Sequence, residues 1–142
     1  MEKRRPPLVA LFVVDASVVC SWVLPDEEQA LSEVSLNRLQ QFGAIAPDLL
    51  WYEVRNVLAV SCRRKRISVE QAKEALAKLR RSDILTIPVN DDAAVLDLGS
   101  RYSLSAYDAA YLTLALERKL ALATLDQRLA AAALQAGCPL LA

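Results

Sequence analysis

Short apolar runs alternate with longer helical patterns along this chain, and the alternation restricts its fold more than any other feature. Residues 8–14 are continuously apolar and rich in β-branched side chains, which is typical of a strand buried on both faces. Further strands are predicted at 44–46, 84–89, 120–124 and 139–141, and helices at 17–24, 27–42, 49–64, 68–80, 91–102, 105–119 and 126–135. Because strands separated by helices pair in parallel, the sequence predicts an α/β fold, a three-layer α/β/α sandwich around a parallel sheet.

Local signals mark the ends of several predicted helices. Pro25 ends the first helix, and Gly43 and Gly137 follow the last residues of two others. Ser68 and Gln71 have the spacing of a capping box, in which each side chain bonds to the backbone of the other residue. We therefore expect a helix to begin directly after Ser68.

A chain of 142 residues has room for one domain. Lys3, Arg4 and Arg5 precede the first apolar run, as in a secretory signal peptide, but Asp15 ends that run and no small-residue cleavage site follows. We therefore expect residues 1–7 to form a frayed leader and residues 8–142 to form the single domain. The chain contains no apolar stretch of about 18 residues, so no membrane span is predicted.

The residue types that are rare or missing exclude several chemistries. The chain has no histidine, which removes Ser-His-Asp triads and His-ligated zinc. Its three glycines are far apart, so it has no Walker loop and no dinucleotide-binding turn. Three scattered cysteines are too few for a disulfide framework or a zinc site and indicate a reducing, cytoplasmic location. Basic and acidic residues number 17 each, which excludes a strongly basic coat for nucleic acid.

Four acidic residues lie where packing alone does not readily explain them. Asp15 and Asp126 follow predicted strands, at the edge where a parallel sheet opens into its ligand crevice. Glu53 interrupts the apolar stripe of its predicted helix, and Asp108 is the sole charge in the apolar segment 106–116. Structural alternatives remain for all four. Asp15 and Asp126 can cap helices, whereas Glu53 can pair with an arginine of its own helix. Asp108 can complete a capping box with the serine three residues before it.

Taken together, the four carboxylates indicate a metal site. Four anions share a small site of low dielectric constant only if some are protonated or a cation is present. Oxygen ligands without histidine or clustered thiolates favour Mg²⁺ or Mn²⁺. Such an ion is suited to phosphoryl chemistry, because it lowers the pKa of a bound water and neutralises the phosphate.

The segments that carry these acids resemble a PIN-domain ribonuclease, and specifically a toxin of the VapC type. They are VVDASVVCSWVLPDE at 13–27, WYEVRNVL at 51–58, LSAYDAAYLTLA at 104–115 and LATLDQRLAAAA at 122–133. RKRISVEQAKEAL at 64–76 is similar to a further helix of the family. The resemblance runs from Phe12 to Leu141 and implies a sheet of five parallel strands in the order 3-2-1-4-5. It also implies a homodimer and an antitoxin encoded beside it, whose tail blocks the site, often with an arginine.

The same resemblance implies that catalysis uses a metal held by the four acids. The metal-binding and catalytic residues would be Asp15, Glu53, Asp108 and Asp126, supported by Ser17, Asn56 and Thr124. Asp15 and Asp108 would anchor the main ion. Glu53 would bind it through water or orient the attacking hydroxide, while Asp126 would complete the shell or hold a second ion. The implied reaction is Mg²⁺- or Mn²⁺-dependent endonucleolytic cleavage of RNA that leaves a 5′-phosphate and a 3′-hydroxyl.

RNA contacts are predicted less directly. The strongest basic cluster consists of Arg63, Arg64, Lys65 and Arg66. These cations suit backbone phosphates, but they equally suit a solvated helix end, where they complement the macrodipole. Three aromatic residues, Trp22, Trp51 and Tyr107, either stack on bases or pack in the core, and packing is the favoured interpretation.

Three alternative functions stay open from the sequence. A PIN nuclease that processes RNA or DNA would carry the same acids. A PIN fold kept only as a protein-binding module would need none of them to bind metal. A small-molecule binder of the α/β class is disfavoured by the lack of a glycine-rich loop.

Overall fold

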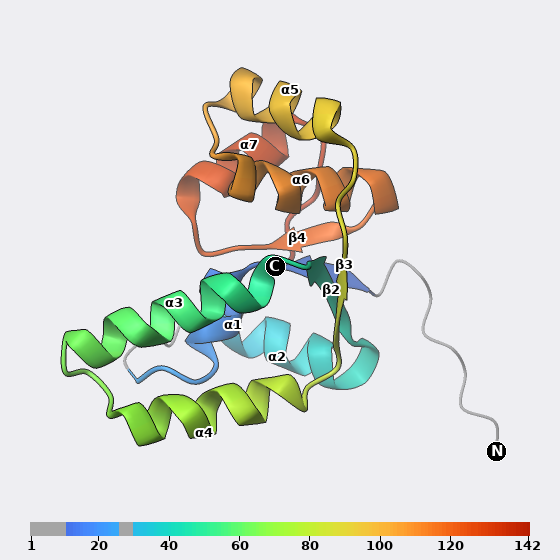
Figure 1. Cartoon of the computed structure of the whole chain (residues 1–142). Coiled ribbons are helices and arrows are strands. Elements are labelled where there is room, and N and C mark those ends of the chain that lie inside the picture. The colour runs from blue at the N-terminus through green and yellow to red at the C-terminus, as the bar shows by residue number, and fades with distance from the viewer. Residues whose placement is uncertain (1–10, 26–29) are drawn as a thin grey trace, which may run out of the picture.

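The computed structural model describes residues 11–25 and 30–142 of the chain. The expected leader at 1–7 therefore lies outside the described residues, as do the beginning of the first predicted strand at 8–10 and the beginning of the second predicted helix at 27–29. The part of the chain described here contains a parallel sheet between two layers of helices, as predicted (Figure 1).

The sheet contains four parallel strands in the order β3-β2-β1-β4. They are β1 (Phe12–Val14), β2 (Ala44–Pro47), β3 (Ile84–Ile87) and β4 (Ala121–Ala123). In the central strand, Val13 pairs with Ile45 on one side and with Leu122 on the other. All three residues of β1 are fully buried, which explains why its sequence is continuously apolar rather than alternating.

The segment predicted as a fifth strand, 139–141, forms only an isolated parallel bridge between Leu140 and Leu122. Leu122 N donates to Pro139 O at 2.9 Å, and Leu141 N donates to Leu122 O at 2.9 Å. Pro139 has no N–H to extend the ladder. The prediction of five strands is therefore wrong in number, although this segment lies beside β4, where the predicted order 3-2-1-4-5 puts its last strand.

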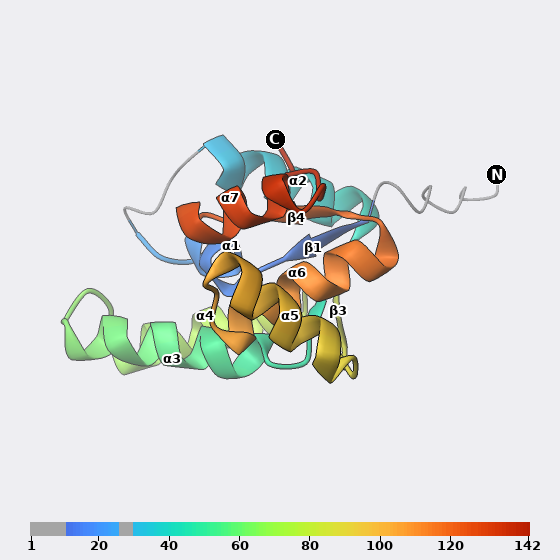
Figure 2. The same cartoon turned by 90° about the horizontal axis from the view of Figure 1, so that it is seen from above.

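Seven helices cover the sheet in the described part of the chain, at the positions where helices are predicted. They are α1 (Ala16–Ser21), α2 (Ala30–Phe42), α3 (Leu50–Arg63), α4 (Val69–Arg80), α5 (Asp92–Tyr102), α6 (Ala106–Arg118) and α7 (Gln127–Gln135). Figure 2 shows α2 and α7 on one side of the sheet and α3, α5 and α6 on the other. Residues 109–115 of α6 are all buried, which accounts for the nearly uniform apolar character of that helix.

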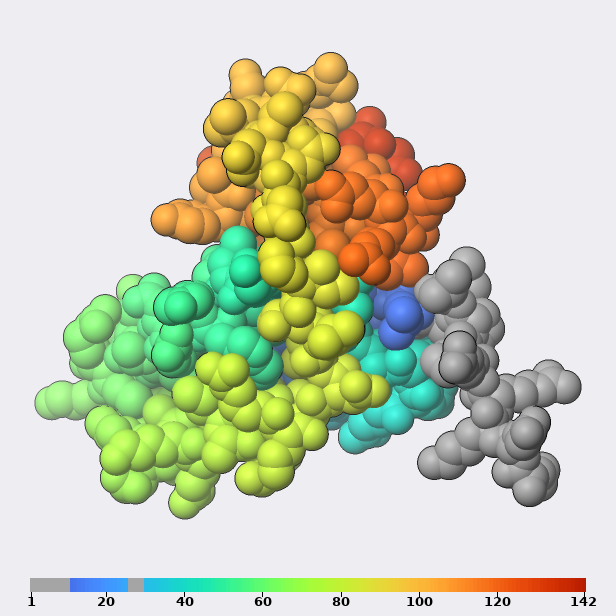
Figure 3. Space-filling model, turned by 45° about the vertical axis from the view of Figure 1, so that its right-hand side comes forward, coloured from blue at the N-terminus to red at the C-terminus, as the bar shows by residue number. Residues whose placement is uncertain are grey.

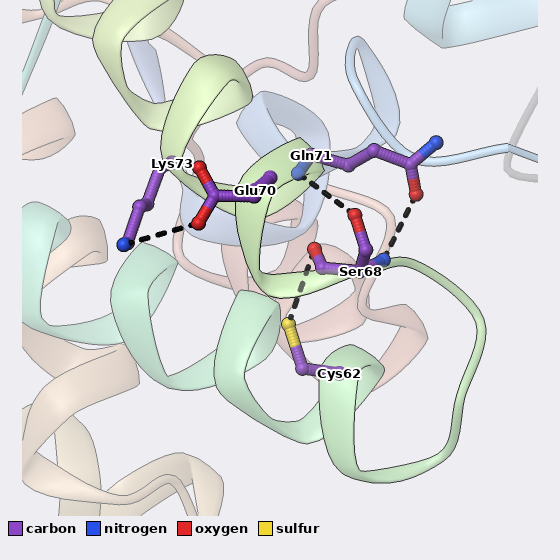
Figure 4. A network of polar contacts seen from close by, with 5 residues as sticks. All are labelled: Cys62, Ser68, Glu70, Gln71 and Lys73. Carbon is purple, nitrogen blue, oxygen red and sulfur yellow. Dashed lines mark hydrogen bonds and ion pairs between the residues drawn. The ribbon is translucent and has the colours of Figure 1, made fainter.

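The predicted capping box begins α4. Ser68 Oγ accepts from Gln71 N at 3.0 Å, and Gln71 Oε1 accepts from Ser68 N at 2.9 Å (Figure 4). In the same network Cys62 Sγ contacts Ser68 O at 3.7 Å. The helices α3 and α4 run side by side and extend away from the sheet, so the turn that joins them stands clear of the other elements (Figures 1 and 2).

The edge strand β3 and the segment that leads from it to α5 run along the outside of the molecule (Figure 3). β3 pairs only with β2, and the side chain of Leu85 is 63% exposed. Gly43 lies between α2 and β2 and ends α2 with φ +79°. A Cβ on Gly43 would lie 2.7 Å from Asp83 Oδ2, so both the backbone angle and the space favour glycine. Among the described helices, none is long and apolar enough to span a membrane.

Candidate active site

A cavity of about 730 Å³ lies at the carboxyl ends of β1 and β4 and reaches between α3 and α6. This volume is within the usual range for ligand-binding clefts. Among residues 11–25 and 30–142, its lining contains all four predicted acids and neither lysine nor arginine. The lining residues are Asp15, Ala16, Ser17, Leu49, Tyr52, Glu53, Asn56, Val57, Tyr107, Asp108, Tyr111 and Asp126.

Asp15 directly follows β1 and is only 6% exposed. Its Oδ1 accepts from Ser17 Oγ at 2.5 Å and from Val18 N at 3.1 Å, and its Oδ2 accepts from Thr124 Oγ1. Burial raises the pKa of Asp15, although these three donors act to lower it. The Val18 contact makes Asp15 the N-cap of α1, so the structural alternative is also correct.

The two hydroxyls that hold Asp15 also join the ends of β1 and β4. Ser17 Oγ accepts from Leu125 N at 2.9 Å, and Thr124 Oγ1 accepts from Asp126 N at 3.0 Å. The loops that carry Asp15 and Asp126 are thereby bonded to each other. The structure thus brings both predicted supporting hydroxyls against the buried carboxylate.

Glu53 lies in the first turn of α3, and its partner is Tyr111 of α6. The Tyr111 hydroxyl donates to Glu53 Oε1 at 2.7 Å. Burial raises the pKa of Glu53, and so do the charges of Asp108 and Asp15, whereas the hydroxyl lowers it. The predicted alternative, an arginine of the same helix, is wrong for Arg55, whose guanidinium lies over the ring of Tyr52.

Sequence reasoning did not identify Tyr111 as a site residue. Its side chain is 1% exposed, and burial and the neighbouring carboxylates raise its pKa far above the usual value. A buried tyrosine hydroxyl usually finds a hydrogen-bond partner. The signal was therefore a tyrosine within a helix that is apolar on all sides, although the sequence alone does not tell which acceptor it meets.

Asp108 lines the cavity, but the capping box predicted for it is only half formed. Ser105 Oγ accepts from Asp108 N at 3.1 Å, so Ser105 caps α6 through the backbone of Asp108. The carboxylate lines the cavity. Burial raises the pKa of Asp108 and the charge of Asp126 raises it further, while Ser105 and Arg128 act to lower it.

Asp126 is the exposed member of the four. Its Oδ1 accepts from Arg128 N at 2.9 Å and from Leu129 N at 3.1 Å, which makes it the N-cap of α7. It lines the same cavity as the other three acids. The helix-capping alternative is therefore correct for Asp126, and it coexists with a place in the cavity.

The donor set fits a hard divalent ion. Burial raises the pKa values of Asp15, Glu53 and Asp108, neighbouring carboxylates raise them further, and a cation would relieve that repulsion. All four carboxylates and the amide of Asn56 offer oxygen, the ligand atom that Mg²⁺ and Mn²⁺ prefer. As the side chains stand, no group of three or more acidic, histidine or cysteine residues within 11–25 and 30–142 is arranged to hold such an ion. Metal binding therefore stays a proposal.

The structure does not bring the basic cluster to the cavity. Arg63 to Arg66 are exposed at the end of α3 and in the turn before α4, and none of them lines the acidic site. Arg66 Nη2 donates to Pro25 O at 3.1 Å. The exposure of the cluster at a helix end agrees with the structural interpretation, and its contacts with RNA stay a prediction.

The three aromatic residues differ in their environments. Trp22 Nε1 donates to Ser32 O and to Ser35 Oγ, both at 3.1 Å, and Trp51 lies under the guanidinium of Arg80 at 4.3 Å. Packing is therefore confirmed for these two residues. It is wrong for Tyr107, whose side chain is 65% exposed on the cavity lining because the first turn of α6 extends past the buried part of the helix.

Comparison with known families adds to this geometry. The chain matches the PIN domain family over residues 12–135, which includes all four strands, all seven helices and the four acids. The chain belongs to the PIN-domain family. The predicted resemblance is thereby confirmed, and so is the α/β/α fold class.

Among curated relatives, this PIN domain is 32% identical over 122 residues to "Ribonuclease VapC3" of Pyrobaculum aerophilum. The alignment covers 83% of this chain and 91% of the relative. The crystal structure of PAE2754 from Pyrobaculum aerophilum matches with a TM-score of 0.68 and 24% identity, over 85% of this chain and 84% of the other. The structural likeness supports the fold, and the sequence likeness places the PIN domain with the VapC type.

Proposed function

We propose that this PIN domain is a Mg²⁺- or Mn²⁺-dependent endoribonuclease and the toxin of a type II toxin–antitoxin pair. The observation that carries the proposal is the convergence of four carboxylates, from four separate elements, on one cavity whose lining has no lysine or arginine. Such a cavity is better suited to bind a hard cation than to bind an anionic substrate without a cation. The name of the VapC3 relative supports RNA as the substrate.

The residues of the site have separable tasks in this proposal. Asp15, held by three donors, is the rigid anchor for the ion, and Asp108 is the second anchor. Glu53, oriented by Tyr111, holds the attacking water or a water of the ion. Asp126 completes the ligand set or holds a second ion, and Asn56 supports it from α3. When bound, a divalent ion lowers the pKa of a water and neutralises the scissile phosphate.

The remaining parts of the proposal concern partners and location. A cavity lined by carboxylates is complementary to an arginine carried by an antitoxin tail. The exposed basic cluster at the end of α3 is a second surface for phosphates of the RNA, away from the cavity. We further propose a homodimer and a cytoplasmic location, in line with the VapC-type relative.

The test of the nuclease is Asp108→Asn, with Asp97→Asn on the exposed surface of α5 as the matched control. Asp108→Asn is expected to reduce RNA cleavage by at least about 100-fold, because loss of a ligand exceeds the effect of outer-shell changes. Mn²⁺ should raise the melting temperature of the wild type and of Asp97→Asn, but much less that of Asp108→Asn. Full activity of Asp108→Asn would remove Asp108 from the site, and a wild type indifferent to Mn²⁺ would favour a protein-binding module.

The test of the toxin is expression in growing cells. The wild type is expected to stop growth unless the antitoxin is co-expressed, while Asp108→Asn is tolerated at the same protein level. An active wild-type nuclease that cells tolerate freely would instead support a role in RNA or DNA processing.

A further inference from the structure

Two exposed tyrosines lie at the mouth of the acidic cavity, and the proposed chemistry gives them no task. Tyr52 is 71% exposed and Tyr107 is 65% exposed, yet both belong to the cavity lining. In the described part of the chain six large hydrophobic side chains are exposed, and these two are the aromatic ones among them. Exposed aromatic rings are thus found beside the acids, whereas the other exposed apolar residues are aliphatic.

Helix geometry explains why each ring lies at the rim. Tyr52 directly precedes Glu53 on α3, and Tyr107 directly precedes Asp108 on α6. Successive side chains on a helix point about 100° apart. An acid that faces the cavity therefore places the preceding tyrosine at its edge. The helices α3 and α6 are separate elements (Figure 1), and each contributes one of the two tyrosines to the cavity lining.

The ring of Tyr52 is supported by a cation. The Arg55 guanidinium carbon lies 4.7 Å from the centroid of the Tyr52 ring, and Arg55 Nε donates to Trp51 O at 3.3 Å. The arginine covers one face of the ring and leaves a largely exposed side chain available on the other. It also places positive charge at the edge of a cavity that is lined by carboxylates.

We propose that Tyr52 and Tyr107 stack on the bases of unpaired nucleotides on the two sides of the scissile phosphate. The inference rests on the proposed nuclease function and assigns two positioning residues for its RNA substrate. Bases within a duplex are already stacked and paired, so they do not reach two separated rings. Stacking on tyrosine tolerates any base, because every base has a π-face. The rings therefore position the strand, while discrimination between bases lies elsewhere.

Binding is measured with the full-length Asp108→Asn chain, so that cleavage does not interfere, and a fluorescently labelled single-stranded oligoribonucleotide. Tyr52→Ala and Tyr107→Ala, each added to this parent, are expected to weaken Kd by about 5- to 100-fold. Tyr52→Phe and Tyr107→Phe keep the ring and are expected to bind within about twofold of the parent. Leu96→Ala, at another exposed apolar position, is the matched control and should bind like the parent.

An oligonucleotide with abasic positions around its centre separates stacking from charge. The parent should bind it more weakly than either single alanine variant binds the intact strand, because abasic positions remove both stacks, and on this abasic strand the alanine variants should bind like the parent. Alanine variants that bind like the parent would overturn the inference, and so would phenylalanine variants as weak as alanine. If the wild type cleaves RNA and the tyrosine variants bind and cleave it equally well, this inference is wrong but the proposed function stands. If RNA binding depends on the tyrosines but the wild type cleaves no RNA in the presence of Mn²⁺, the proposed function is wrong and this inference stands.

Discussion

Tyr111→Phe isolates the hydrogen bond that holds Glu53. The substitution removes one hydroxyl and keeps a ring of nearly the same shape in a position that is 1% exposed. That hydroxyl donates to Glu53 Oε1 at 2.7 Å, and its own raised pKa keeps it protonated at every working pH. The substitution therefore changes how Glu53 is held with little disturbance of the packing between α3 and α6.

The expected cost depends on pH. A hydrogen bond to a charged group contributes about 1.5–3 kcal/mol, and the half-buried position of Glu53 favours the lower end, about 1.5 kcal/mol. This contribution is present in full while Glu53 is ionised. Once the carboxyl is protonated, the bond is a neutral one of about 0.5–1.5 kcal/mol. The loss of stability in Tyr111→Phe should therefore be larger at pH 8 than at pH 4, and the pKa of Glu53 should rise.

The assay is urea unfolding of the metal-free protein at several pH values, for the wild type, Tyr111→Phe, Glu53→Ala and the double variant. The double-mutant cycle at pH 8 should give a coupling of about 1 kcal/mol or more between the two positions. The acid limb of the pH–rate profile for RNA cleavage should also move to higher pH in Tyr111→Phe. An equal loss at all pH values, or a coupling near zero, would refute the reasoning.

Three further predictions concern the same fold. Burial raises the pKa of Asp15, so the folded state binds its proton more tightly than the unfolded state; stability of the metal-free protein should rise as pH falls through that raised pKa toward the ordinary value of 3.8, and Asp15→Asn should remove this gain in urea titrations. Gly137→Ala, at φ +82° in open space, should cost about 1–2 kcal/mol, and Gly43→Ala should cost more, because its Cβ would also meet the carboxylate before β3. Thr124→Val and Thr113→Val each remove a buried hydroxyl donor and should lower the melting temperature, but only Thr124→Val should also reduce the rise in melting temperature that Mn²⁺ produces.

Much of the fold was predictable because the pattern of apolar residues and the helix-capping signals depend on residues only a few positions apart. The continuously apolar β1, the Ser68 capping box and the position of Asp15 after a buried strand all depend on neighbours in the chain. The partner of Glu53 was not predictable, because Tyr111 meets it only through the packing of α6 beside α3. The exposure of Tyr107 was missed for a similar reason, since an apolar helix sequence does not show where the helix leaves the core.

The four acids lie at the beginnings of four helices, and this explains why a helix-capping role and a place in the cavity coexist for Asp15 and Asp126. Asp15 and Asp126 are the N-caps of α1 and α7, while Glu53 and Asp108 lie in the first turns of α3 and α6. The helices α1, α3 and α7 follow strands and begin at the carboxyl ends of those strands. The helix α6 follows α5 instead and leads into β4, and its first turn lines the same cavity. The positive end of each helix dipole stabilises a nearby carboxylate. The fold thus offsets part of the repulsion among the four acids, and in the proposed function the same helix beginnings supply the ligands of the ion.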